Sequence, residues 1–165
     1  RSVELIEEGS TIFLGTGTTV EQMASMLPAF RLRIVTNSLS VFNLLEARED
    51  CDLCLVGGMY RRRTAAFVGP TAEDTLRALG IDAAFIGANG ILDGDVSTSN
   101  MEEGRIQQLA FSKADSRYLI ADSSKIGKRD FYTFCRLDSL DAVVCVPGIT
   151  AEDRAAIEEH TQVIC

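Results

Sequence analysis

The chain has 165 residues, the size of one ordinary domain, and 46% of them are hydrophobic, which is enough to build a core. Its formal net charge of −8 argues against a general nucleic-acid-binding surface, which would carry a basic excess. No apolar run approaches the ~20 residues of a membrane span, and the first residues do not resemble a secretory signal. We therefore expect a cytoplasmic protein without membrane contact.

The chain starts at Arg1 rather than at methionine, and residues 1–9 have the pattern of the last turns of an amphipathic helix. We therefore expect a fragment of a longer protein. Five cysteines leave at least one unpaired, and most of them lie in apolar runs, which favours reduced thiols in a reducing compartment.

The first predicted strand, residues 11–14, leads into a loop rich in glycine and threonine. The loop consists of Gly15, Thr16, Gly17, Thr18 and Thr19, and a helix with a regular apolar face follows it. Backbone N–H groups and hydroxyls at such a turn converge on one point, which suits an anion such as phosphate. The alternative is an ordinary tight loop in which Thr18 caps the helix and Glu21 completes a capping box.

Strands and helices alternate along the rest of the chain. Apolar runs predict strands at residues 34–35, 53–56, 83–86, 118–121 and 142–146, an outlying strand at 131–135 and a terminal strand at 163–165. Helices are predicted after Asn37 or Ser38 (with Leu44 on the apolar face), from Pro70, over 101–114 and from Thr150. Residues 87–90 and 93–95 are expected to form loops, and the stretch that follows residues 57–58 and runs through the arginines to residues 67–70 is less regular.

The predicted strands are uniformly apolar, which is typical of a parallel sheet covered on both sides. We therefore expect a single α/β domain over residues 1–165, with a mostly parallel sheet and helices on both faces. Polar and glycine residues gather at residues 15–19, 36–38, 57–63, 87–90 and 122–125, where predicted strands end. Because the carboxyl ends of parallel strands share one edge, we expect these segments to form one pocket.

Several charged side chains near these strand ends could serve a ligand. Lys125 could supply the charge that holds a phosphate, and one arginine of residues 61–63 could add a guanidinium fork. Glu102 and Glu103 could transfer protons or hold sugar hydroxyls, although acidic residues in a first helical turn also favour the helix dipole. His160 is the only histidine, which leaves no Ser-His-Asp arrangement, and we expect neither a metal nor a cofactor.

Six short motifs in this order resemble the C-terminal effector-sensing domain of DeoR-family bacterial transcriptional regulators. They are residues 15–19 (GTGTT), 36–38 (TNS), 57–61 (GGMYR), 67–70 (FVGP), 82–91 (DAAFIGANGI) and 121–125 (ADSSK). The resemblance implies an N-terminal helix-turn-helix domain for operator DNA, absent from this chain, and assembly into homo-oligomers. The effector it implies is a phosphorylated sugar or a related metabolite. Many members carry an acidic residue where this chain has Gly15, so the effector of another member cannot simply be transferred.

The chain also resembles ribose-5-phosphate isomerase, in which a Gly-Thr-Gly loop and an Ala-Asp-x-Ser-Lys segment hold the substrate phosphate. This resemblance implies a ribose-5-phosphate-isomerase-like fold, with phosphate contacts from residues 16–19 and from Lys125. Where the isomerase carries carboxylates, this chain has Asn89 and Gly90, and neither can accept a proton as a base. We therefore expect a sensor and not an enzyme.

The expected phosphate-binding residues are Gly15, Thr16, Gly17, Thr18, Thr19 and Lys125. The expected sugar-binding residues are Asn37, Ser38, Gly57, Arg61, Asn89, Gly90 and Glu102. Two other interpretations stay open: an aldose–ketose isomerase acting on a sugar phosphate, and a module that serves only oligomerisation.

Overall fold

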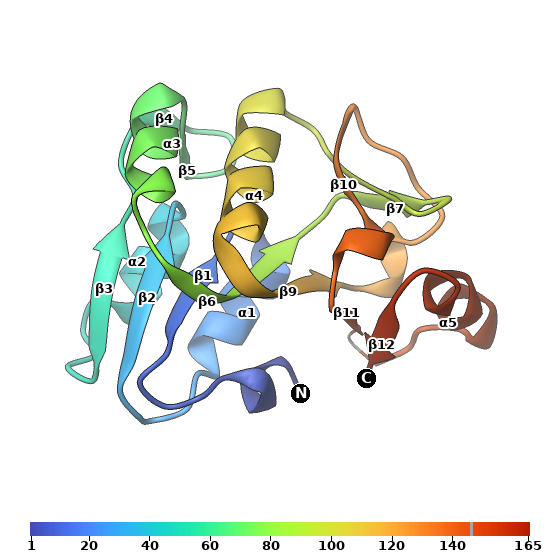
Figure 1. Cartoon of the computed structure of the whole chain (residues 1–165), viewed down its shortest axis with the longest axis horizontal. Helices are drawn as coiled ribbons and strands as arrows, with labels where there is room; N and C mark the ends of the chain where they lie inside the picture. Colours follow the sequence, from blue (N-terminus) through green and yellow to red (C-terminus); the bar gives the residue numbers. More distant parts are fainter. Residues whose placement is uncertain (146) are drawn as a thin grey trace.

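The computed structural model of the chain describes residues 1–145 and 147–165, and its centre is a parallel sheet of seven strands (Figure 1). The strands are β1 (Thr11–Leu14), β2 (Leu32–Thr36), β3 (Cys51–Leu55), β6 (Ile81–Gly87), β9 (Ala114–Ala121), β11 (Ala142–Cys145) and β12 (Gln162–Ile164). Every neighbouring pair in this sheet runs parallel. The predicted single α/β domain is confirmed. Val146, which the prediction included in a strand, lies outside the described residues.

The order of the strands changes direction once. Across the sheet the order is β12-β11-β9-β6-β1-β2-β3, so the chain builds outward from β1 to β3 and then returns to the other side of β1 with β6. The two directions meet between β1 and β6, where Phe13 is in register with Ala84. A crevice at the carboxyl ends of the strands on either side of such a switch is where open α/β sheets bind ligands.

Helices cover both faces of the sheet, as predicted (Figure 1). Helices α1 (Thr18–Ser25) and α2 (Leu39–Leu45) pack on the face to which Ile12 and Leu14 point. Helices α3 (Pro70–Arg77), α4 (Met101–Lys113) and α5 (Ala151–Glu158) contribute to the other core, which contains Phe13. Successive residues of β1 thus enter opposite cores, because side chains alternate across a strand.

Two small antiparallel sheets stand outside the main sheet and were not predicted as such. β4 (Met59–Arg61) pairs with β5 (Ala66–Val68), in the stretch expected to be irregular. β7 (Gly90–Leu92) pairs with β8 (Asp95–Thr98), which also pairs with β10 (Tyr132–Arg136). Residues 93–95 were expected to form a loop, and Asp93 and Gly94, with φ values of 51° and 81°, do make a tight turn between β7 and β8, whereas Asp95 is already the first residue of β8. β10 confirms the outlying strand.

Several predicted helix ends are confirmed. Ser38 caps α2 by accepting a hydrogen bond from the Val41 amide at 3.2 Å, Pro70 is the first residue of α3, and Thr150 caps α5. Other details were wrong. The chain begins with a 3₁₀ turn at Ser2–Leu5 instead of an α-helix, and Leu44 on α2 is 49% exposed.

The remaining helix boundary that differs is that of α1. Gly17 is its N-cap and Thr18 its first residue, so the capping box between Thr18 and Glu21, which belonged to the alternative interpretation of this loop, does not form. Within the described ranges, none of the helices has both the length and the apolar character needed to cross a membrane.

Candidate functional site

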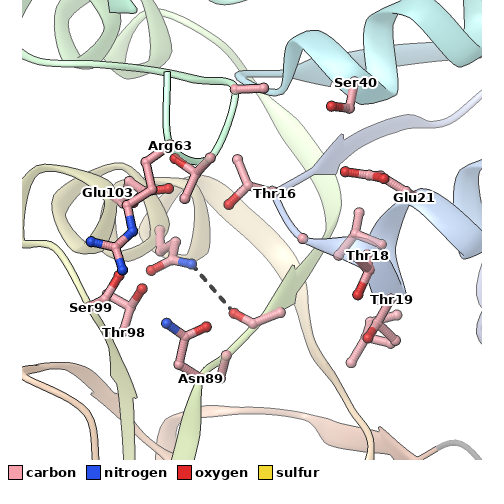
Figure 2. Close-up of a pocket in the computed structure, with 18 of the residues that line it drawn as sticks. Thr16, Thr18, Thr19, Glu21, Ser40, Arg63, Asn89, Thr98, Ser99 and Glu103 are labelled. Atoms are coloured by element: carbon pink, nitrogen blue, oxygen red, sulfur yellow. Dashed lines mark hydrogen bonds between the residues drawn. The ribbon is translucent and has the colours of Figure 1, made fainter. Parts of the chain in front are cut away.

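A cavity of about 380 Å³ lies at the carboxyl ends of β1 and β6, where the strand order changes direction. Its lining comes from the residues after β1, the residues after β6, the end of β8, one face of α4 and the loop between β4 and β5. Figure 2 shows two walls that face each other across the open space. Thr16, Thr18 and Thr19 lie on one side, and Asn89, Thr98, Ser99 and Glu103 lie on the other.

The first wall is the start of α1. Gly17 is the N-cap, with φ at 110°, a conformation that favours glycine, and it has no side chain to accept a hydrogen bond. The amides of the first turn, at Thr18, Thr19 and Val20, therefore have no partner within the helix. These residues line the cavity, so N–H groups and threonine hydroxyls are gathered at the positive end of the helix dipole.

Lys125 adds a positive charge to the cavity from the short 3₁₀ helix at Ser123–Lys125. The Asp122 carboxylate holds this turn, because it accepts hydrogen bonds from both the amide and the hydroxyl of Ser124. The hydrogen bond from the Ser124 hydroxyl, together with that from its amide, lowers the pKa of Asp122 and keeps the carboxylate charged. Asp122 thus fixes the turn that presents Lys125, whose ammonium suits an anion.

The second wall is built on α4, which begins after the N-cap Asn100. Glu103 and Gln107, one helical turn apart, share the face that lines the cavity, and they are only 4% and 6% exposed. Glu103 Oε2 accepts a hydrogen bond from Arg61 Nε at 3.0 Å. Gln107 Nε2 donates to the carbonyl oxygen of Gly87 at 3.4 Å, marked by the dashed line in Figure 2.

The loop of the β4–β5 hairpin, residues 62–65, lies at the rim. Arg62 and Arg63 are exposed and line the cavity together with Thr64 and Ala65. Ala65 has a positive φ of 52°, which is uncommon for a residue with a side chain, and its carbonyl oxygen accepts a hydrogen bond from the Leu39 amide at 2.9 Å. This contact ties the loop to α2 and brings two guanidinium groups to the edge of the site.

Part of the predicted ligand set comes together in this cavity. The predicted residues that line it are Thr16, Gly17, Thr18, Thr19, Asn89 and Lys125. Asn89 also donates from Nδ2 to the Asp130 carboxylate at 2.9 Å, which orients its side chain. That these residues bind a ligand stays a prediction, but three separate strand ends do meet here, as expected.

The other predicted ligand residues do not line the cavity, and most have a structural role. Asn37 and Ser38 are buried. Asn37 Nδ2 donates a hydrogen bond to the carbonyl oxygen of Phe67 at 3.1 Å, and the backbone carbonyl oxygen of Asn37 accepts one from the Phe67 amide at 2.8 Å. Together with the Ser38–Ala66 bridge, these bonds hold the β4–β5 hairpin against the main sheet. The motif at residues 36–38 therefore acts on the cavity only through the loop that it positions.

Five more predicted residues lie beside the site. Gly15 is buried, and its amide donates to Phe85 O at 3.0 Å within the sheet. Gly90 is a packing glycine, because a Cβ there would lie 2.5 Å from the carbonyl oxygen of Lys128. Gly57 and Glu102 are exposed outside the cavity. Arg61 is held by Glu103, and it reaches the site through that carboxylate.

Several lining residues were not predicted, namely Glu21, Ser40, Thr64, Thr98, Ser99 and Gln107. Of the arginines 61–63, Arg61 was assigned to the site, whereas Arg62 and Arg63 line the cavity; of the two adjacent glutamates, Glu102 was assigned, whereas Glu103 lines it. Among the residues that the structure describes, no group of three or more histidine, cysteine, aspartate or glutamate side chains is placed to hold a metal ion. All five cysteines, each of them within the described ranges, are free thiols.

Comparison with solved structures shows the class of fold. Over 76% of this chain and 50% of the other, the structure is similar to ribose 5-phosphate isomerase A from Methanocaldococcus jannaschii, with a TM-score of 0.52 and 18% sequence identity. At this identity the similarity shows the fold alone, and it confirms the predicted ribose-5-phosphate-isomerase-like architecture.

Comparison of sequences shows the family. The model of the DeoR C-terminal sensor domain matches residues 1–145, so the chain belongs to this family, as its motifs predicted. Two curated relatives are each described as a lactose phosphotransferase system repressor. The one from Staphylococcus epidermidis is 42% identical over 99% of this chain, and the one from Lactococcus lactis is 38% identical over 99% of it. The chain spans 65% and 66% of the length of these relatives.

Proposed function

We propose that this chain is the ligand-sensing domain of a transcriptional repressor and that its effector is a phosphorylated sugar or a related metabolite. The names of the curated relatives support a repressor, and the family is one of sensor domains. The observation that carries the ligand class is the convergence of free first-turn amides of α1, threonine hydroxyls and Lys125 on one cavity. In this proposal operator DNA is bound by a helix-turn-helix domain outside this chain, and the protein works as a homo-oligomer in the cytoplasm.

The donors around the first wall favour a phosphate over a neutral ligand group. A phosphate ester offers several acceptor oxygens and negative charge, which match N–H groups at a helix N-terminus and a lysine ammonium. The exposed Arg62 and Arg63 at the rim add charge where a ligand enters. A cavity of about 380 Å³ is within the size range of small-molecule sites and suits a single phosphorylated sugar.

A thermal-shift panel tests the proposal. It contains ribose 5-phosphate, galactose 6-phosphate, glucose 6-phosphate, glucosamine 6-phosphate and the corresponding free sugars. At least one phosphorylated sugar is expected to stabilise the domain, because a ligand at 100 times its Kd adds about 2.7 kcal/mol to the free energy of unfolding. The free sugars are expected to do much less. Equal shifts with phosphorylated and free sugars would contradict a phosphate site.

Two lysines of one loop provide a matched pair of variants. Lys125→Ala is expected to weaken the stabilising ligand at least tenfold, since it removes a charge-assisted contact to phosphate. Lys128→Ala removes the same charge three residues away, at an exposed position outside the cavity, and is expected to leave the affinity nearly unchanged. Equal effects of the two variants would show general charge attraction and not a contact from Lys125.

A further inference from the structure

Two buried polar atoms in the cavity wall lack hydrogen-bond partners. Across residues 1–145 and 147–165, three buried side-chain atoms are unpaired: Thr64 Oγ1, Gln107 Oε1 and Arg117 Nε. Two of these belong to residues that line the cavity, and they come from different elements, the β4–β5 loop and α4. Buried polar groups are nearly always hydrogen-bonded in native proteins. Two such atoms without partners, both in residues that line one cavity, indicate that a ligand supplies the missing hydrogen bonds.

The orientation of the Gln107 amide follows from its neighbour. The carbonyl oxygen of Gly87 can only accept, so the Gln107 nitrogen faces it and Oε1 faces away. The distance of 3.4 Å is long for a hydrogen bond, and the terminal torsion of glutamine is broad, so the amide is held weakly. Oε1 can therefore turn toward a donor that enters the cavity.

The two walls differ in hydrogen-bonding character. The first wall offers donors, namely the α1 amides and the Lys125 ammonium. The α4 wall contains acceptors. The Glu103 carboxylate is neutralised on one side by Arg61, and Gln107 Oε1 is shielded in this conformation and becomes available to a ligand when the weakly held amide turns. A fully ionised phosphate has no hydrogen to donate, so it cannot satisfy the α4 wall. Sugar hydroxyls can, because each supplies one O–H.

We infer that the α4 wall, through Gln107 and Glu103, together with Thr64 of the β4–β5 loop, is the hydroxyl-recognising end of the cavity. The ligand is then a phosphate ester whose hydroxyl groups lie away from the phosphate, and phosphate alone fills only half of the site. This inference rests on the proposed function, and it moves hydroxyl recognition from Asn37, Ser38 and Glu102 to Glu103, Gln107 and Thr64.

Two adjacent glutamines on α4 allow a matched test. Gln107→Met keeps the size of the buried side chain and removes the amide, whereas Gln108→Met makes the same change at an exposed position. The affinity of wild type and both variants is measured by calorimetry for the phosphorylated sugars of the panel and for inorganic phosphate, and the melting temperature is measured without ligand. Thr64→Val removes the other unpaired polar group, a hydroxyl in the rim loop, and serves as an independent variant if Gln107→Met does not fold.

Gln107→Met is expected to weaken the sugar phosphate about five- to tenfold, the worth of one hydrogen bond, and to leave inorganic phosphate unaffected. Its melting temperature without ligand is expected to stay the same or rise, because an unpaired buried acceptor is removed. Thr64→Val is expected to weaken the same ligand by a smaller factor, and Gln108→Met is expected to change neither quantity.

Each other outcome has a defined meaning. If a sugar phosphate binds wild type and Gln107→Met equally well, the inference of a hydroxyl-recognising wall is wrong while the proposed function stands. If Gln107→Met does not fold, equal affinity of wild type and Thr64→Val has the same meaning. A lower melting temperature with unchanged affinity assigns Gln107 a structural role and also overturns the inference. If no phosphorylated sugar binds wild type, the proposed function itself fails, and the inference fails with it.

Discussion

The ion pair between Arg61 and Glu103 joins the β4–β5 hairpin to the start of α4. The Glu103 side chain is 5% exposed and that of Arg61 is 27% exposed, so the carboxylate is removed from water and depends on the guanidinium. A buried charge that loses its partner keeps its desolvation cost without compensation. Removal of Arg61 alone is therefore costly, and the pair fixes the position of the Glu103 carboxylate at one side of the cavity.

Arg61→Met is expected to lower the free energy of unfolding by about 2 kcal/mol or more, because it leaves the Glu103 carboxylate unpaired. Urea unfolding at neutral pH measures this loss. The double variant Arg61→Met/Glu103→Gln is expected to recover part of it, since no buried charge remains. Arg62→Met, at the exposed neighbouring position, is the control and is expected to change stability by less than about 0.5 kcal/mol. Equal losses in the two single variants would argue against the pair.

Cys135 on β10 gives the domain a pH dependence on the alkaline side. Burial raises the pKa of this thiol from 9.0 to about 12, because the thiolate is disfavoured away from water. The unfolded chain therefore loses the proton at lower pH than the folded chain. The contribution of the protonated Cys135 thiol to the free energy of unfolding is fully present below pH 9, and it is lost as the pH rises from there toward about 12.

Unfolding experiments on wild type and Cys135→Ala at pH 8 and pH 11 test this effect. Between pH 8 and pH 11, the free energy of unfolding of wild type is expected to fall by roughly 1–3 kcal/mol more than that of Cys135→Ala. The comparison cancels lysines and tyrosines, which titrate in both proteins, and any cavity left by alanine adds only a constant offset. Parallel curves would contradict an ionisation penalty at Cys135.

The adjacent residues Glu102 and Glu103 show how far a sequence pattern can identify a residue that lines the cavity. The sequence pattern alone did not separate the two glutamates by their place in the first helical turn. The apolar stripe of α4, Ile106 and Ala110, lies at spacings that place Glu103 and Gln107 on the same face, so helical periodicity could have selected Glu103. The pairing of Glu103 with Arg61 spans 42 residues of sequence and has no local signal.

At the level of elements, long apolar runs were predictable and short hairpins were not. Apolar runs of four or more residues carry their own signal, and their burial in a parallel sheet follows from it. β4, β5 and β7 have three residues each, so their pairing depends on tertiary contacts. The Asp93-Gly94 turn is an exception, since Asp-Gly between two short apolar segments is a known hairpin signal.

The β4–β5 hairpin explains why part of the candidate site was not predictable. Its loop, residues 62–65, reaches the cavity because residues 36–38 hold β5 against the sheet and the Leu39 amide holds Ala65. The positive φ of Ala65 has no sequence signal, because glycine or asparagine is the usual residue there. Residues 36–38 were correctly recognised as a motif, but the motif positions the loop and lies outside the cavity.

At the level of the whole molecule, the cavity joins the two directions in which the sheet grows. The first wall, at the start of α1, follows β1. Asn89 follows β6 and Lys125 follows β9, and these two strands lie on the other side of the point where the strand order changes direction. The parallel order of apolar strands made this edge predictable as a ligand site. Which side chains point into it depends on helix rotation and on the hairpin, which is why only some of the expected residues line it.

The same architecture bears on catalysis, because the fold is shared with an isomerase. An aldose–ketose isomerase needs a base that removes a proton next to the carbonyl group. Within the described residues, Glu21 and Glu103 are the carboxylates that line the cavity, and Glu103 is held by Arg61. The side chain of Asn89, at the position where the isomerase resemblance implies a carboxylate, cannot accept a proton as a base.

We therefore expect no turnover. Incubation with ribose 5-phosphate or glucosamine 6-phosphate is expected to give no isomerised product above the rate without protein, while a ribose-5-phosphate isomerase in the same assay serves as the positive control. Binding measured in parallel shows that the substrate reaches the cavity, so lack of product then reports the chemistry of the site. Product formation that disappears in Glu21→Gln or Glu103→Gln would overturn the sensor proposal in favour of an enzyme and would identify its base.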